Sequence, residues 1–244
     1  MILDPLIISK IKSAKRVTVL SGAGISAESV IPTFRGAGGY WKSYRAEDLA
    51  TPEAFALNPK LVWEWYCMRM QVCLDAKPNP GHDIVAKMEQ YFPEFLLITQ
   101  NVDGLHVRAG NKKLVEIHGN IFTARCTTCN TKFTFQKVPL EIPVNCVSCG
   151  KLARPHIVWF GESYDMEILN QARNFLLKSD LIFIIGTSGQ VSVPVQLAIE
   201  AIKNGAYSVE INPEISTLSN EVDMHFAKPS GDILPKIWQE IIEN

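Results

Sequence analysis

Four of the six cysteines stand in two C-x-x-C pairs, the pattern in this chain with the most specific chemistry. Cys126 and Cys129 form the first pair, Cys146 and Cys149 form the second, and sixteen residues lie between them. Each pair can place two thiolates on one tetrahedral ion, so the spacing predicts a structural Zn²⁺ ribbon. Four thiolates leave no open coordination position, so we expect the metal to have no catalytic role.

A glycine-rich turn follows the first strongly apolar run of the chain. Residues 22–27 fit the pattern G-x-G-x-x-A. In a dinucleotide-binding turn, the first glycine allows a tight bend, the second lets the backbone approach a pyrophosphate, and the following helix offers free N–H donors. A glycine turn with a purely structural role shows the same pattern, so both interpretations stay open here.

The acidic residue that holds the ribose in a dehydrogenase lacks its usual context. It would close a second strand about 20 positions after the turn, where this chain has Glu47 and Asp48 with no strand pattern before them. We therefore expect a dinucleotide that is bound in an unusual way, and hydride transfer is disfavoured.

Two further groups of polar side chains could form part of a site. Residues 99–106 place Thr, Gln, Asn and Asp directly after an apolar run, and they form either a satisfied turn or the wall of an active site. His118 follows the short apolar run at residues 114–117. A lone histidine is more often structural, but its place between two predicted lobes also suits a general base.

Four apolar runs predict buried parallel strands that would position these groups. They cover residues 17–20, 95–98, 181–185 and 208–211. Helical patterns cover residues 58–74, 82–91, 165–178, 195–204 and 233–242. Because ligands bind at the carboxyl ends of the strands in a doubly wound sheet, we expect the site at that edge.

Two stretches interrupt the alternation of strands and helices and predict a second lobe. The expected fold is α/β, a Rossmann-like doubly wound parallel sheet with a smaller inserted lobe. The sheet domain would comprise residues 1–35, 81–118 and 156–244. A helical insertion at 36–80 and a zinc-binding module at 119–155 would form the small lobe, with a ligand cleft between the lobes.

Composition limits the classes of partner and compartment. The 244 residues are 47% apolar and carry a net charge of −1 without a basic block, which disfavours nucleic acid as a partner. No apolar run reaches the roughly 18–20 residues of a membrane span. The start of the chain lacks the features of a secretory signal or a transit peptide, so we expect a cytoplasmic protein without a membrane partner.

Several of these motifs together resemble the sirtuins, a family of NAD-dependent enzymes. The resemblance covers nearly the whole chain, and the motifs occur in the family's order. It depends on the four cysteines and on residues 22–26, 31–35, 100–103, 118–119, 158–162, 186–188 and 212–214. It implies NAD-dependent removal of acyl groups from protein lysines, with nicotinamide, O-acyl-ADP-ribose and free lysine as products.

The resemblance also implies roles for individual residues. His118 would be the general base, and Asn101 and Asp103 would complete the catalytic set beside the nicotinamide and its ribose. The other NAD-binding positions would be Gly22, Ala23, Gly24, Ile25, Ser26, Ala27, Glu28, Ile31, Pro32, Thr33, Phe34, Arg35, Tyr40, Trp41, Gln100, Val102, Gly186, Thr187, Ser188, Asn212, Pro213, Glu214 and Ser230. An acylated lysine peptide would pair as an added strand with the segment that holds Val158, Phe160, Gly161 and Glu162.

Acyl specificity is predicted by a pair of residues on one helix face. Tyr66 and Arg69 stand three apart and resemble the Tyr-x-x-Arg pair of the desuccinylase and demalonylase type, class III, which prefers succinyl, malonyl and glutaryl groups. Ala50 matches the small residue that widens the acyl pocket in that type. A guanidinium can bind a carboxylate bidentately. The alternative is that Arg69 is a surface charge paired with Glu64 or Asp75.

The sequence departs from the family pattern at two places. Val30 occupies a position where sirtuins usually have glycine, so the cofactor loop is expected to be stiffer or shifted. The segment from Gly186 to Pro194 is one residue longer than usual. Two other functions remain as alternatives, a protein ADP-ribosyltransferase and a non-catalytic, NAD-sensing zinc-ribbon protein. A monomer is compatible with these features.

Overall fold

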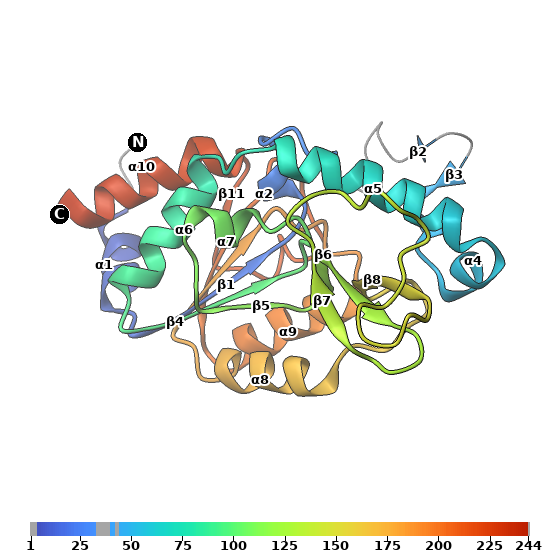
Figure 1. Cartoon of the computed structure of the whole chain (residues 1–244). Helices are drawn as coiled ribbons and strands as arrows, with labels where there is room; N and C mark the ends of the chain where they lie inside the picture. Colours follow the sequence, from blue (N-terminus) through green and yellow to red (C-terminus); the bar gives the residue numbers. More distant parts are fainter. Residues whose placement is uncertain (1–3, 33–39, 42–43, 244) are drawn as a thin grey trace.

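The large lobe is built on a six-stranded parallel sheet (Figure 1). The computed structural model describes residues 4–32, 40–41 and 44–243. The strands lie in the order β11-β10-β9-β1-β4-β5, and every neighbouring pair is parallel. Their bounds are β1 (Arg16–Ser21), β4 (Glu94–Thr99), β5 (Leu114–Glu116), β9 (Leu181–Ile185), β10 (Tyr207–Ile211) and β11 (Met224–Phe226).

The four predicted strands of this sheet are confirmed, and two edge strands were not predicted. β5 and β11 contain three residues each, too few for a pattern of burial to show in the sequence. The chain runs outward from β1 through β4 and β5, then returns to the other side of β1 at β9. This reversal makes the sheet doubly wound, with a ligand crevice expected at the carboxyl ends of β1 and its neighbours.

Helices cover both faces of the sheet because its central strands are buried on both sides. One face packs against α1 (Pro5–Ser13), α6 (Pro80–Tyr91) and α10 (Ser230–Glu243), and the other against α8 (Met166–Leu176) and α9 (Ser192–Lys203) (Figure 1). Successive residues of β9 alternate between these two cores. Each buried Leu, Ile or Phe contributes about 1.5–3 kcal/mol, so this sheet is a rigid base for the residues at its edge.

The five predicted helices are present, with ends that differ by a few residues. α2 (Gly24–Ala27) is the helix expected after the glycine turn, although it is short. α1 and the short helices α3 (Ala46–Leu49), α4 (Pro52–Leu57) and α7 (Leu105–Ala109) were not predicted as separate helices. α1 begins at Pro5, and the side chain of Asp4 accepts the N–H of Leu6, so Asp4 is the N-cap of this helix and Pro5 its first residue. None of the described helices is long and apolar enough to cross a membrane.

The small lobe is a three-stranded antiparallel sheet packed against two helices (Figure 1). Its elements are β6 (Gly119–Cys126), β7 (Lys132–Thr134), β8 (Ala153–Ile157), α4 (Pro52–Leu57) and α5 (Pro59–Asp75). Nearby, β2 (Tyr40–Trp41) pairs with β3 (Tyr44–Arg45). The Nε1–H of Trp63 donates to the carbonyl of Ala153 at 2.9 Å, which ties α5 to β8 inside this second core.

Candidate active site and metal centre

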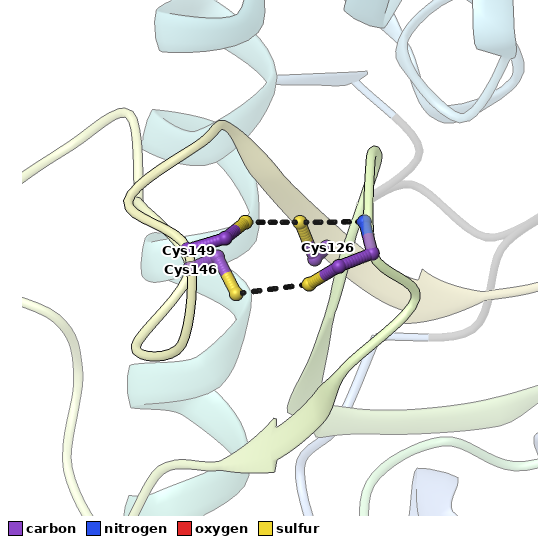
Figure 2. A group of neighbouring side chains, drawn as sticks. Cys126, Cys146 and Cys149 are labelled. Atoms are coloured by element: carbon purple, nitrogen blue, oxygen red, sulfur yellow. Dashed lines mark hydrogen bonds between the residues drawn. The ribbon is translucent and has the colours of Figure 1, made fainter.

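The four cysteines of the two C-x-x-C pairs converge at one end of the small lobe. Figure 2 shows Cys126, Cys146 and Cys149 directed toward one another. Cys126 Sγ lies 3.5 Å from Cys149 Sγ, and Cys129 Sγ lies 3.7 Å from Cys146 Sγ. All four sulfur atoms lie within 4.8 Å of one another, a spacing that suits bonds of about 2.3 Å to one tetrahedral ion.

Backbone N–H groups point at these sulfur atoms and stabilise their thiolate form. Cys126 Sγ accepts from the N–H of Thr128 at 3.3 Å and of Cys129 at 3.4 Å, and Cys146 Sγ accepts from Ser148 at 3.4 Å. Such outer contacts orient metal ligands. The predicted zinc cluster is confirmed in its geometry: the cysteines are positioned to bind one zinc ion.

The two glycines of the turn after β1 are required by the neighbouring backbone. A Cβ on Gly24 would lie 2.6 Å from Gly186 Cα, and one on Gly22 would lie 2.8 Å from Gly186 O. Gly186 follows β9 and has a φ of +63°, in the left-handed region that glycine tolerates. The glycine pattern therefore has a structural cause, the close contact between the turns after β1 and β9, besides any role toward a phosphate.

The same turn also retains a donor that fits a phosphate group. The N–H groups of Gly22 and Gly24 donate to the carbonyls of Ile185 and Gly186 at 2.9 and 2.8 Å. Within the described chain, the N–H of Ala23 has no acceptor, although this residue is half-buried. Free N–H groups at the start of a helix bind phosphate, so the residues present fit the pyrophosphate of a dinucleotide.

Asn101 and Asp103 lie at the carboxyl end of β4 and are joined to the glycine turn. Asn101 Nδ2 donates to Gly22 O at 3.0 Å and to Ser26 Oγ at 3.1 Å. Ser26 Oγ in turn donates to Asp103 Oδ2 at 2.8 Å, while Asp103 Oδ1 accepts the N–H of Leu105. Burial raises the pKa of Asp103, and these hydrogen bonds oppose the rise. The structure thus brings three predicted site residues into one buried network.

Two buried histidines support this network, and the sequence did not single them out. The backbone N–H of Asn79 donates to His82 Nδ1 at 3.3 Å, so the ring proton is on Nε2, which faces Ser26 Oγ at 3.4 Å. The His106 ring packs on the His82 ring with 4.9 Å between centroids. Burial lowers the pKa of His82 to about 4 and that of His106 to about 3. Both rings are therefore neutral at pH 7. The signal in the sequence was the N-cap Asn79 three residues before His82.

His118 lies between β5 and β6, beside the loop that carries Asn101. Its Nδ1 contacts Gln100 O at 2.9 Å and its Nε2 contacts Tyr164 Oη at 3.0 Å. A carbonyl only accepts hydrogen bonds, so Nδ1 carries the proton and Nε2 presents a lone pair. Burial lowers the pKa of His118, which keeps the ring neutral. Nε2 is therefore the basic atom, and Tyr164 is a neighbour that the sequence did not indicate.

Several of the predicted NAD-binding residues lie at the carboxyl ends of β9 and β10. Gln100 Nε2 donates to Thr187 Oγ1 at 3.1 Å, and Asn212 Nδ2 donates to Thr187 O at 3.0 Å. Ser230 Oγ donates to Glu28 Oε1 at 3.0 Å, which links α10 to the residue after α2. Ser188 lies in the same turn as Thr187, and Pro213 and Glu214 are exposed after β10.

Other predicted cofactor positions lie away from this contact network or outside the described residues. Thr33, Phe34 and Arg35 are outside the described residues, while Tyr40 and Trp41 form β2. Ile31 is half-buried and Pro32 is exposed. Ile25, Ala27 and Val102 flank the network, with Ile25 in the core of the sheet and Val102 in the core of the small lobe.

Val30 shows how this chain differs from the glycine expected at that position. Its φ is +61°, and its side chain is 83% exposed. A β-branched residue is strained in the left-handed region, so the backbone keeps a conformation typical of glycine while the side chain projects into solvent. The departure changes the local strain and leaves the hydrogen bonds of Ser26 in place.

Tyr66, Arg69 and Ala50 lie around the segment at residues 158–162. Trp159 Nε1 donates to Tyr66 Oη at 2.8 Å, and the N–H of Phe160 donates to Ala50 O at 3.0 Å. The Arg69 guanidinium lies 5.7 Å from the centre of the Tyr66 ring. Its charge opposes the rise in the pKa values of Tyr66 and Asp103 that burial causes, so Arg69 acts electrostatically on both side chains.

Glu162 holds the segment in shape. Its carboxylate pairs with Arg154, with Nη2 to Oε2 at 2.8 Å, and accepts the N–H of Trp159 at 2.9 Å. Val158 N–H donates to His118 O at 3.0 Å. In the described part of the chain, the carbonyl of Val158 and both backbone groups of Gly161 remain without partners. These groups are available to an extended peptide.

The fold and the site together define a nucleotide-binding α/β enzyme with a structural metal cluster. Residues 22–193 match the model of the Sir2 family. An NAD-dependent protein deacylase of Leptospira interrogans is 51% identical over 232 residues, 94% of this chain and 94% of that protein. The mitochondrial NAD-dependent protein deacylase sirtuin-5 of Canis lupus familiaris is 42% identical, covering 91% of this chain and 81% of that protein. The crystal structure of a Sir2 homolog–NAD complex is similar with a TM-score of 0.94 and 38% identity, covering 99% of this chain and 95% of that one.

The chain belongs to the Sir2 family, the sirtuins. It is an NAD-dependent protein deacylase, so its substrates are proteins. The family resemblance, the Rossmann-like sheet, the dependence on NAD and the zinc cluster that the sequence predicted are thereby confirmed.

Proposed function

We propose that this deacylase removes acidic acyl groups, succinyl, malonyl and glutaryl, from lysine side chains in extended peptides. The observation that carries the proposal is the pair of donors beside each other in the apolar core of the small lobe. Tyr66 is fully buried, and Arg69 lies 4.8 Å from the Trp65 ring and 5.7 Å from the Tyr66 ring. An acyl group that ends in a carboxylate would accept hydrogen bonds from both side chains. An acetyl group ends in a methyl group and offers neither side chain a carboxylate.

Peptide binding along residues 158–162 is supported by the free backbone groups of that segment. A partner strand needs donors and acceptors at its edge, and main-chain hydrogen bonds of this kind give affinity with little sequence preference. The carbonyl of Val158 lies next to His118, whose own carbonyl binds the Val158 N–H. An acylated lysine that enters beside Val158 would therefore arrive at the base.

His118 acts as the base in the proposed reaction through its Nε2 atom. The Tyr164 hydroxyl now lies 3.0 Å from Nε2, within the reach that proton transfer requires. A ribose hydroxyl in the same place would give its proton to Nε2, while Nδ1–H stays fixed on Gln100 O. NAD, when bound, supplies the ribose carbon that accepts the acyl group, with nicotinamide as the leaving group.

Asn101 and Asp103 would orient the nicotinamide ribose from the end of β4. Asn101 is held by two hydrogen bonds from Nδ2, so its carbonyl oxygen has a fixed direction. Asp103 is held by Ser26 and Leu105. Because neighbouring groups already hold these side chains, binding the co-substrate would require little reorganisation.

The test replaces Arg69 with methionine, which keeps an unbranched apolar stem and removes the charge. We expect Arg69→Met to lower kcat/KM for a succinyl-lysine peptide and to leave kcat/KM for the acetyl-lysine peptide unchanged. The loss corresponds to roughly 2–4 kcal/mol of transition-state stabilisation, the scale for losing a buried charge pair. Lys60→Met removes a charge from an exposed position of the same helix and is the matched control. Equal losses on both peptides would contradict the proposed preference.

A further inference from the structure

The hydrogen bond between Trp159 and Tyr66 has only one possible direction. Trp159 Nε1 and Tyr66 Oη are 2.8 Å apart, and both side chains are buried, with exposures of 2% and 0%. An indole N–H is a donor and never an acceptor. The phenolic oxygen of Tyr66 must therefore accept, and its own proton points elsewhere.

The hydroxyl proton of Tyr66 remains available to a ligand. No acceptor for it is found among the described residues. Burial raises the pKa of Tyr66 to about 12, so the hydroxyl keeps its proton over the physiological range. A buried donor without an acceptor is costly. A carboxylate, which only accepts hydrogen bonds, is the chemical group that fits this donor.

The Trp159 ring is held from several sides and cannot turn away. The Arg154 guanidinium lies 3.4 Å from the ring centre, and Glu162 Oε2 accepts the backbone N–H of Trp159 at 2.9 Å. The Phe55 ring lies 5.4 Å away. The direction of the indole N–H is therefore set by the same ion pair that shapes the peptide-binding segment.

We infer that Trp159 is a positioning residue for acyl selectivity, because its N–H directs the Tyr66 hydroxyl to donate to the carboxylate of an acidic acyl group. Trp159 acts through Tyr66 and does not itself need to touch the carboxylate. This inference rests on the proposed preference for acidic acyl groups. It adds Trp159 to Tyr66, Arg69 and Ala50, the residues already expected to set that preference.

The experiment compares kcat/KM on matched succinyl-lysine and acetyl-lysine peptides. In Trp159→Phe, we expect the succinyl-to-acetyl ratio to fall about tenfold, the scale of one hydrogen bond to a charged group. Trp63→Phe is the matched control, because it also removes an indole hydrogen bond, from Trp63 Nε1 to Ala153 O, in the same core. Its ratio is expected to stay within about twofold of the original protein.

A double-variant cycle distinguishes an effect of Trp159 on the direction of the Tyr66 hydroxyl from an effect on the packing of the core. In a Tyr66→Phe background there is no hydroxyl to direct, so adding Trp159→Phe should leave the ratio unchanged. A further tenfold fall in the double variant would overturn the inference, and so would equal losses on both peptides in Trp159→Phe. If the unaltered protein shows no preference for succinyl-lysine and Arg69→Met leaves the ratio unchanged, the proposed function itself fails.

A second replacement covers the case in which Trp159→Phe does not fold. Incorporating β-(3-benzothienyl)alanine at position 159 replaces the N–H with sulfur and keeps the size of the ring. The same tenfold fall in the ratio is expected. An unchanged ratio in this folded variant would overturn the inference, because only the donor has been removed.

Discussion

In the large lobe, Asn101, Ser26 and Asp103 satisfy one another at the edge of the sheet, whereas in the small lobe the Tyr66 hydroxyl keeps a proton without a described acceptor. Ser26 Oγ accepts from Asn101 and donates to Asp103. Tyr66 Oη accepts from Trp159 and has no described acceptor for its proton. Under the proposed function, the groups that would orient the ribose are already held by other groups of the protein. The group that would select the acyl chain is instead completed by the substrate.

The two lobes also differ in how their sheets are covered by helices. The central strands of the large sheet are buried on both faces by helices. The small sheet has one helical face, and β7 contains only three residues. Its far end is joined by the four cysteines. We therefore expect the small lobe to depend on the metal and the large lobe to depend on apolar burial.

Loss of the metal should give the largest effect and should separate the lobes. Cys126→Ser is expected to abolish zinc binding, which contributes on the order of 10 kcal/mol in structural sites. The backbone amides of residues 126–152 should then lose their protection against hydrogen exchange, while the amides of β1 and β9 keep it. Metal analysis and hydrogen exchange measure this, with Cys67→Ser, a cysteine outside the cluster, as the control. A simultaneous loss of protection in β1 would show that the two lobes do not unfold independently.

His118→Tyr should remove catalysis and leave both lobes folded. General-base catalysis contributes up to roughly 10⁴-fold, so we expect turnover to fall by about 10³-fold or more, with zinc content and Tm close to those of the original protein. His156→Asn alters a histidine on β8 outside the site and should retain turnover. Substantial activity in His118→Tyr would mean that another residue is the base.

The buried histidines of the large lobe should make its stability sensitive to acid. His82 and His106 have folded pKa values of about 4 and 3, below the ordinary 6.5, so the unfolded chain binds protons first. Stability is then full above pH 6.5 and falls as the pH drops. The expected loss from pH 7 to pH 5 is roughly 2–4 kcal/mol.

The variant His106→Phe should reduce this acid sensitivity by about half, because one of the two rings no longer titrates. Denaturant unfolding at pH 7, 6 and 5 measures the slope of stability against pH. The control is His225→Gln on β11, at the edge of the sheet, which leaves both buried rings in place. An unchanged slope in His106→Phe would indicate that other groups cause the acid sensitivity.

Val30→Gly should give the smallest effect, a gain in stability of about 1 kcal/mol or less. The left-handed backbone at Val30 costs roughly 1–2 kcal/mol for a residue with a side chain, and the greater freedom of glycine in the unfolded chain offsets part of the gain. Ala27→Gly, at an exposed position of α2, should instead destabilise. Thermal unfolding compares the two variants, and a lower Tm for Val30→Gly would show that the strain is absent.

The sequence predicted the central sheet because β4 and β9 contain continuous apolar runs and β1 and β10 are rich in apolar residues. It predicted the cysteine cluster because the ligand spacing is local. It could not predict the contact of His118 Nε2 with Tyr164, which is 46 residues away. The packing of Gly24 against Gly186 was likewise hidden, since a phosphate-binding turn and a close backbone contact require the same residue. Side-chain direction, as in Trp159 and Tyr66, needed the folded core.

The hydrogen bond from Val158 N–H to His118 O has a consequence for motion in the enzyme. It continues the β6–β8 pairing of Gly119 with Ile157, so under the proposed function the peptide-binding segment and the base are joined through the small sheet. A movement of that sheet relative to the large one would carry the acylated side chain and the imidazole together. Nucleotide exchange by such a movement would leave the alignment of the reacting atoms undisturbed.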